Sequence, residues 1–250
     1  MNKISYDERA KFYDKEVMID PIKIKFFQKI KRELNLNKTL YFPCASGIYL
    51  DTFSTVFDKS YFADINYKMI EELSKKIFAS KIDNVYASVL DLRDVNNVSE
   101  NVDCIFVLDQ AMQYIDYEDF EKFLINASLV TKYIVLDIFD FNKEGILSYF
   151  NSTISNNEFY KSKEFELEDK KVTRYNSHKV EKDKITFQYN YETSLKEKHS
   201  TSFILNNYSL ESTLEIIKRT GKYKIANCFK DYNMNNYDNA GQFILILEKV

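Results

Sequence analysis

Two short segments of this chain carry the residue types that a nucleoside-binding site needs. The first is a turn of small residues, Cys44, Ala45, Ser46 and Gly47, close behind an apolar run. The second is Asp64, near the end of the next apolar run. Small residues let a backbone approach a ligand closely, and a carboxylate after the following strand can accept hydrogen bonds from both ribose hydroxyls. The two segments therefore predict a βαβ unit that binds a nucleoside.

Alternating apolar and amphipathic segments predict the elements that must position these residues. We expect one helix to begin at Pro21, with Asp20 as a favourable N-cap and Pro21 as a favourable first residue. Two more helices are expected to begin after Asn66 and Asp116. Another helix is expected over Gly47–Val56. The predicted strands are Thr39–Phe42, Lys59–Ile65, Asn84–Leu90, Val102–Leu108 and Tyr133–Phe139. Strands that alternate with helices indicate an α/β fold with a doubly wound, mostly parallel sheet.

The pattern changes after about Gly145, where amphipathic helices give way to short β-like runs. These runs are Glu164–Leu167, Val172–Tyr175, Ile185–Tyr191 and Ser202–Leu205. They predict an antiparallel insertion over residues 145–205, within a single domain that spans residues 1–250. After the insertion we expect a last helix capped by Ser209, and then a hairpin of Lys224–Phe229 and Gln242–Leu247.

Composition argues against several classes of function. The net charge of −3 gives no basic excess of the kind that nucleic-acid-binding proteins carry. The N-terminal residues are polar, and the longest apolar run, Tyr133–Ile138, is too short to span a membrane. Cys44, Cys104 and Cys228 are far apart and form no C-x-x-C pair, so neither a zinc site nor a disulfide framework is indicated. We expect a cytoplasmic protein that binds no metal, nucleic acid or membrane.

Taken in order, these segments resemble a class I S-adenosylmethionine-dependent methyltransferase, which has a Rossmann-like fold. The nearest group is the small-molecule enzymes that methylate amino or hydroxyl groups of nucleotide-linked sugars and similar metabolites. The resemblance covers nearly the whole chain and is carried by the order of five segments rather than by any one of them. The five segments are Tyr6–Asp14, Cys44–Gly47, Asp64–Met69, Val89–Leu92 and Asp103–Ile115.

The resemblance implies S-adenosylmethionine as the cofactor. It implies that Asp64 holds the ribose, that Asp91 meets the adenine amino group, and that the N-terminal segment folds over the cofactor. The residues implied in cofactor binding are Tyr13, Cys44, Ala45, Ser46, Gly47, Asp64, Ile65, Met69, Asp91, Leu92 and Leu108.

The chain departs from the family in its first motif. Members usually have an acidic residue in the first strand where this chain has Tyr41 or, with one position of slack, Phe42. Pro43 and Ala45 replace the first two glycines of the motif. The missing carboxylate leaves open which group neutralises the ammonium of the methionine moiety.

Five residues are candidates for the chemistry of methyl transfer. Tyr13 and Gln113 are expected to position donor and acceptor, the latter at a place where relatives often carry His. If the acceptor is a neutral amine, positioning is sufficient. If it is a hydroxyl, a general base is needed, and His178, His199 or Asp109 could serve. Each has a plainer alternative: a core tyrosine, a helix-start residue or a surface histidine.

The insertion is expected to cover a small-molecule acceptor and can join subunits into a homodimer. Its mixture of aromatic and basic residues suits an anionic, partly apolar acceptor such as a nucleotide-linked or phosphorylated sugar; these residues are Tyr160, Arg174, Tyr175, Tyr189 and Tyr191. Two rival interpretations remain. One is a non-catalytic binding or scaffold protein that kept a degenerate methyltransferase fold. The weaker one is a nicotinamide-dependent dehydrogenase, which needs a Gly-x-Gly-x-x-Gly turn that this chain lacks.

Overall fold

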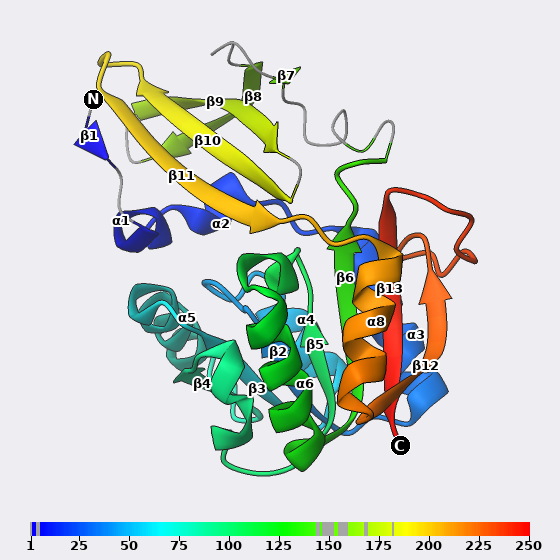
Figure 1. Ribbon diagram of the computed structural model, residues 1–250. Coiled ribbons are helices and arrows are strands. Elements are labelled where there is room, and N and C mark those ends of the chain that lie inside the picture. The colour runs from blue at the N-terminus through cyan, green and yellow to red at the C-terminus, as the bar shows by residue number, and fades with distance from the viewer. Residues whose placement is uncertain are drawn as a thin grey trace.

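The computed structural model describes residues 2–3, 6–143, 146, 153–154, 160–167, 170–181 and 183–250. A seven-stranded sheet occupies the lower half of Figure 1, with the strand order β12-β13-β6-β5-β2-β3-β4. The five strands β6, β5, β2, β3 and β4 are mutually parallel. Strand β13 is antiparallel to β6, and β12 is antiparallel to β13. The strands are β2 (Lys38–Phe42), β3 (Lys59–Asp64), β4 (Val85–Val89), β5 (Val102–Val107), β6 (Thr131–Phe139), β12 (Tyr223–Phe229) and β13 (Gln242–Lys249).

Helices cover both faces of this sheet, which confirms the doubly wound prediction. The first face carries α3 (Pro21–Leu34), α4 (Leu50–Val56) and α5 (Tyr67–Ala79), packed on strand residues such as Phe62 and Phe106. The opposite face, in front in Figure 1, carries α6 (Tyr117–Val130), α8 (Leu210–Thr220) and the 3-10 helix η1 (Leu92–Asn97). A second 3-10 helix, η2 (Ala111–Tyr114), follows β5.

The predicted helix caps are present. The Asp20 side chain accepts a hydrogen bond from the Ile22 N–H, and Asn66, Asp116 and Ser209 cap α5, α6 and α8 in the same way. Each satisfies a backbone donor that the first turn of a helix leaves unpaired. These caps fix where each helix leaves the sheet, and hence which residues remain in the connecting turns.

The smaller sheet is the predicted antiparallel insertion, and it lies above the larger sheet in Figure 1. Its main strands run in the order β11-β10-β9, with β8 also paired to β9. They are β8 (Tyr160–Leu167), β9 (Lys170–Glu181), β10 (Lys184–Thr193) and β11 (Lys198–Asn206); two short strands, β1 (Asn2–Lys3) and β7 (Thr153–Ile154), pair in parallel with β11 and β9. The part of the predicted segment that includes residues 147–152 lies outside the described residues.

Two elements differ from the sequence-based predictions. The helix expected from Gly47 begins only at Leu50, because Ala45 and Gly47 adopt left-handed φ angles that a helix cannot contain. Strand β9 is much longer than the predicted Val172–Tyr175, because its buried residues after Tyr175 are the polar Asn176 and His178, which an apolar pattern does not reveal. The predicted C-terminal hairpin is confirmed as β12 and β13.

Two short helices of the N-terminal segment, α1 (Tyr6–Ala10) and α2 (Tyr13–Glu16), lie between the two sheets (Figure 1). Helix α1 contacts α5, and α2 contacts β8 of the insertion. The N-terminal segment therefore lies over the carboxyl ends of the parallel strands, with the insertion on its other side.

Candidate functional site

The carboxyl ends of β2, β3 and β5 bring together the predicted nucleoside-binding residues. Strand β2 lies between β3 and β5, so the turn that follows β2 is flanked by Asp64 on one side and Asp109 on the other. In open α/β sheets, ligands bind outside the carboxyl ends of the strands. The fold therefore places the two segments singled out by residue type at the edge where a ligand is expected.

The turn after β2 keeps a glycine-like conformation despite having few glycines. Ala45 has a φ of 47°, and Gly47 has a φ of 79°. A side chain added at Gly47 would overlap Leu73 of α5. Replacing Gly47 by a residue with a side chain would therefore displace Leu73 and, with it, α5. Ser46 and Cys44 are buried in this turn, and burial raises the pKa of the Cys44 thiol, so that it stays protonated.

Asp64 fixes the shape of this turn. Its two carboxylate oxygens accept hydrogen bonds from the Ala45 N–H and the Asn66 N–H, both at 2.9 Å. The side chain is buried, and burial raises the pKa of Asp64 above its ordinary value. Asp64 is therefore a buried support of this turn and not a solvent-facing carboxylate. Each oxygen retains a second lone pair, which a ribose hydroxyl could use.

The N-terminal segment is bonded to this turn. Asn66 donates to the carboxylate of Asp7 at 2.7 Å, and Asp14 accepts from Ser46 and pairs with Lys76 of α5. Between these contacts, Tyr13 packs against Ala10, Ala45 and Met69. The structure thus brings Tyr13 and Met69 to the first motif, as predicted.

Apolar side chains near Asp64 differ in their exposure. Ile65, directly after Asp64, is 61% exposed, which is unusual for a large apolar residue beside a buried carboxylate. Leu92 and Leu108 are buried in the two core layers, so they support the edge from beneath. Ile65 is thus the predicted apolar contact that is open to a ligand.

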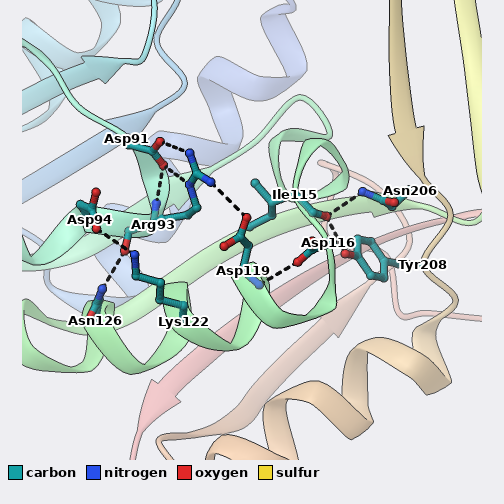
Figure 2. A network of polar contacts seen from close by, with 10 residues as sticks. All are labelled: Asp91, Arg93, Asp94, Ile115, Asp116, Asp119, Lys122, Asn126, Asn206 and Tyr208. Carbon is teal, nitrogen blue, oxygen red and sulfur yellow. Dashed lines mark hydrogen bonds and ion pairs between the residues drawn. The ribbon is translucent and has the colours of Figure 1, made fainter.

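Asp91 follows β4, and Figure 2 shows its carboxylate turned toward Arg93. It accepts hydrogen bonds from the backbone and side chain of Arg93, at 2.6 to 2.9 Å. These bonds lower the pKa of Asp91, and Arg93 also reaches Asp119 of α6. The carboxylate that was expected to meet adenine is therefore bonded to Arg93, and its adenine contact stays a prediction.

Asp109 and Asp137 belong to a group of polar side chains that we call the edge cluster: Lys23, Tyr41, Asp109, Asp137 and Tyr232. Lys23 of α3 pairs with Asp109, which also accepts a hydrogen bond from the Tyr41 hydroxyl at 3.1 Å. The Tyr232 hydroxyl donates to Asp137. Burial raises the pKa of Asp137, and the neighbouring Asp109 adds to the rise. Of these residues, the sequence indicated Asp109 as a candidate base, whereas Lys23 and Tyr232 carried no local signal.

Gln113 has a different role from the one predicted. It is fully buried; its amide donates to the carbonyls of Phe139 and Asn206 and accepts from the Phe139 N–H. These bonds tie the end of β6 to the end of β11. Because the amide is saturated by backbone groups, the predicted contact with an acceptor is wrong for this conformation. Gln113 positions the insertion over the sheet.

Both histidines lie on the insertion face that is turned toward the N-terminal segment and the end of β6. His178 of β9 is opposite Phe187, and His199 of β11 is opposite Tyr191. Burial lowers the pKa of His178, so its imidazole is neutral near pH 7. His199 lines a depression that also includes Phe12 and Tyr191. Both histidines thus belong to the insertion sheet, whereas Asp64 ends one strand of the larger sheet and Asp109 follows another.

The N-terminal segment and the insertion are joined by a buried group that we call the clamp cluster: Arg9, Glu16, Arg174 and Tyr191. Glu16 is fully buried and accepts from Arg9 at 2.7 Å, Arg174 at 2.5 Å and the Tyr191 hydroxyl at 2.9 Å. The guanidinium groups of Arg9 and Arg174 also lie near the ring of Tyr189, at 5.6 and 4.4 Å from its centroid. Only Arg174, Tyr189 and Tyr191 were noted in the sequence, because the partners are far apart along the chain.

Within the described ranges, no group of three or more His, Cys, Asp or Glu side chains is arranged to hold a metal ion. Among the same residues, no helix combines the length and the apolar character needed to cross a membrane.

Comparison with known proteins was made by sequence and by structure. No protein-family model matches this chain, and no curated protein does. A methyltransferase dependent on S-adenosylmethionine from Clostridium acetobutylicum superposes with a TM-score of 0.79 at 18% identity, covering 97% of this chain and 98% of its own. The sugar N-methyltransferase KedS8 from a Streptoalloteichus species gives 0.72 at 14% identity, covering 98% and 94%. CalS10, an amino pentose methyltransferase from Micromonospora echinaspora, gives 0.69 at 12% identity, covering 98% and 99%.

Proposed function

We propose that this chain, which has the class I methyltransferase fold with an antiparallel β insertion before the last helix, is an enzyme that binds S-adenosylmethionine and transfers its methyl group to a small molecule. The observation that carries the proposal is the Asp64 carboxylate, held by the Ala45 and Asn66 N–H groups at the carboxyl edge of β3.

The residues at this edge fit an adenosine-containing cofactor. Asp64 offers lone pairs to two ribose hydroxyls, and the exposed Ile65 side chain offers an apolar surface to a purine ring. Tyr13 and the N-terminal segment cover the turn after β2. When bound, S-adenosylmethionine supplies an electrophilic methyl group on a sulfonium sulfur. What remains for the protein is to orient the acceptor and to exclude water.

The acceptor side of the site is supplied by the insertion. Tyr189 and Phe203 of adjacent strands meet at 5.1 Å between ring centroids, and Phe203 lies 5.9 Å from the ring of Tyr114 in η2. Arg9 and Arg174 lie beside Tyr189. Aromatic faces bind the apolar side of a sugar ring, and guanidinium groups beside such a face are suited to bind an anion. These features support a phosphorylated or nucleotide-linked sugar as the acceptor class.

Among the two possible nucleophiles we favour an amine. Asp109, a candidate base for a hydroxyl, is bonded to both Lys23 and Tyr41. The histidines lie in the insertion sheet, opposite aromatic residues. A neutral amine needs alignment more than proton removal, which suits a site built mostly from such bonded groups. KedS8 and CalS10, which share the fold, are a sugar N-methyltransferase and an amino pentose methyltransferase.

Calorimetric titration of the wild-type chain with S-adenosylhomocysteine tests the cofactor assignment. We expect saturable binding, and Asp64→Asn should weaken it about 30-fold or more, because the ribose hydroxyls lose a charged acceptor and the Asn amide cannot accept from both the Ala45 and the Asn66 N–H. The matched control is Asp103→Asn, near the amino end of β5, because this carboxylate lies at the edge of the sheet away from the proposed site. No binding by the wild type, or equal affinity in Asp64→Asn, would contradict the proposal.

A cofactor-binding protein without catalytic activity is the second candidate. Its support is the altered first motif, with Tyr41 and Ala45 where the family usually has an acid and a glycine. Against it, Ala45 still adopts the left-handed φ angle of a glycine. Binding of S-adenosylhomocysteine without methyl transfer to any of a panel of amino and hydroxyl sugars would favour this second candidate.

A further inference from the structure

The first-strand position at which the family usually has a carboxylate is filled here by Tyr41. Its side chain is almost fully buried among aromatic rings, including those of Phe53 and Phe62. Its hydroxyl, however, reaches the neighbouring strand end and donates to Asp109 at 3.1 Å. Strands β2 and β5 are parallel, with Tyr41 opposite Phe106. The phenol therefore connects the expected position of the acid to a carboxylate that follows β5.

Asp109 is presented by an unusual backbone. Both Asp109 and Gln110 have left-handed φ angles, 60° and 61°. Such angles cost L-residues about 1–2 kcal/mol each, less for Asp than for most. The turn is held by the Gln110 N–H, which donates to the buried Asp137 at 2.9 Å. As a result, the Asp109 side chain is 45% exposed, whereas Asp137 beside it is almost fully buried.

The charge balance at this edge leaves room for a cation. Lys23 is buried and close to both Asp109 and Asp137, so one ammonium group serves two carboxylates. When both carboxylates are ionised, the edge cluster has a net charge of −1. Asp109 carries the accessible part of that charge, and each of its oxygens keeps a free lone pair direction beyond Lys23 and Tyr41.

We propose that Asp109 binds the α-ammonium group of the methionine moiety, in place of the missing first-strand carboxylate. The inference rests on the proposed function. Asp64 follows β3 and Asp109 follows β5, on opposite sides of β2. The cofactor then lies across the end of β2, with its ribose at Asp64 and its amino-acid end at Asp109. The acidic function has moved one strand along the sheet, and Tyr41 orients it.

Two ligands separate this role from a general effect on the fold. The first is S-adenosylhomocysteine, and the second is its analogue in which hydrogen replaces the α-amino group. Titration calorimetry of the full chain should show that the wild type binds the first about 10–100-fold more tightly, the range expected for a charge-assisted hydrogen bond. In Asp109→Asn this preference should vanish, with affinity for the analogue unchanged.

Two further variants complete the test. Tyr41→Phe keeps the aromatic core and removes only the hydroxyl that orients Asp109, so the preference should fall about two- to fivefold. Asp103→Asn, near the amino end of β5 and therefore far along the strand from Asp109, should keep the full preference. If Asp109→Asn and Tyr41→Phe retain the wild-type preference, or if Asp109→Asn weakens both ligands equally, the inference is overturned while the proposed function stands. If the wild type binds neither ligand, the proposed function falls, and this inference with it.

Discussion

The edge cluster and the clamp cluster are both buried networks, but their charges are opposite. The edge cluster has one lysine for two aspartates, whereas the clamp cluster has two arginines for one glutamate. The first lies at the strand ends where we place the cationic cofactor, and the second lies beside the proposed wall for an anionic acceptor. Each cluster therefore has an excess of one charge, which a bound ligand of the opposite charge would balance.

The two clusters also differ in how they can respond when a partner is lost. Buried carboxylates that lack a counter-charge have a raised pKa, so they can take up a proton and become neutral. Arginine cannot lose its charge in a protein. The clamp cluster should therefore be the less tolerant of the two, and variants that remove the minority charge of each cluster test this difference.

Glu16→Gln should have the largest effect, because it removes the buried carboxylate that pairs with both Arg9 and Arg174. Removing one partner from a buried ion pair costs about 3–5 kcal/mol. We expect a loss of that size in the free energy of unfolding, measured by urea denaturation, and nearly the same loss at pH 6 and pH 9. Glu164→Gln, in an exposed ion pair of β8, should leave stability unchanged. A loss below about 1 kcal/mol would show that the clamp is not a structural joint.

The same glutamate gives the wild type a defined acid sensitivity. Burial alone would raise the pKa of Glu16, but Arg9 and Arg174 lower it overall. A carboxylate with a lowered folded-state pKa stabilises the fold above its unfolded value of 4.5, and this contribution is lost as the pH falls through the folded-state pKa. Unfolding free energies measured downward from pH 5 should therefore decrease in the wild type, and more steeply than in Glu16→Gln.

Lys23→Met should be milder, because the buried Asp137, whose pKa is already raised, can take up a proton. We expect a loss of about 2–3 kcal/mol at pH 7, where two carboxylates must stay close without a counter-charge. Removing Lys23 raises the folded-state pKa of Asp137 further. A raised carboxyl pKa makes stability fall as the pH rises through it, so the variant should recover part of the loss at pH 5. Denaturation at both pH values measures this, and an equal loss at each would remove the proposed difference between the clusters.

How much the sequence revealed also differs between the two clusters and the turn beside them. The turn from Cys44 to Gly47 and Asp64 could be predicted, because its hydrogen bonds join residues close to the strand ends that the apolar pattern marks. The fold could also be predicted, because the alternation of apolar and amphipathic segments marks its strands and helices. The clamp cluster could not be, since Glu16 and Arg174 are joined only by tertiary folding. Gln113 was misassigned because its backbone partners, on β6 and β11, are not visible from its own segment.

The left-handed turn offers a smaller test of the edge. Ala45 has a φ of 47°, where alanine is disfavoured by about 1–2 kcal/mol and glycine is not. Replacing Ala45 by glycine removes this strain, but the greater conformational entropy of glycine in the unfolded chain offsets part of the gain in stability. Ala45→Gly should therefore stabilise the protein by about 0.5 kcal/mol in urea denaturation. Ala127→Gly, inside α6, should instead destabilise it by about 1 kcal/mol, and a loss in both variants would mean that the turn is not strained.

The smallest expected effect belongs to the histidines, and it decides the chemistry on the acceptor side. If the acceptor is a neutral amine, proton removal does not limit the rate, and alignment by groups such as Tyr13 does. His178→Gln and His199→Gln should then each change kcat by less than about threefold, while Tyr13→Phe lowers it about 10–100-fold. The pH–rate profile of each histidine variant should match that of the wild type. A hydroxyl acceptor predicts the reverse: one histidine variant would lose about 100-fold in kcat and lose the inflection near neutral pH, which would assign that histidine as the base and exclude the amine.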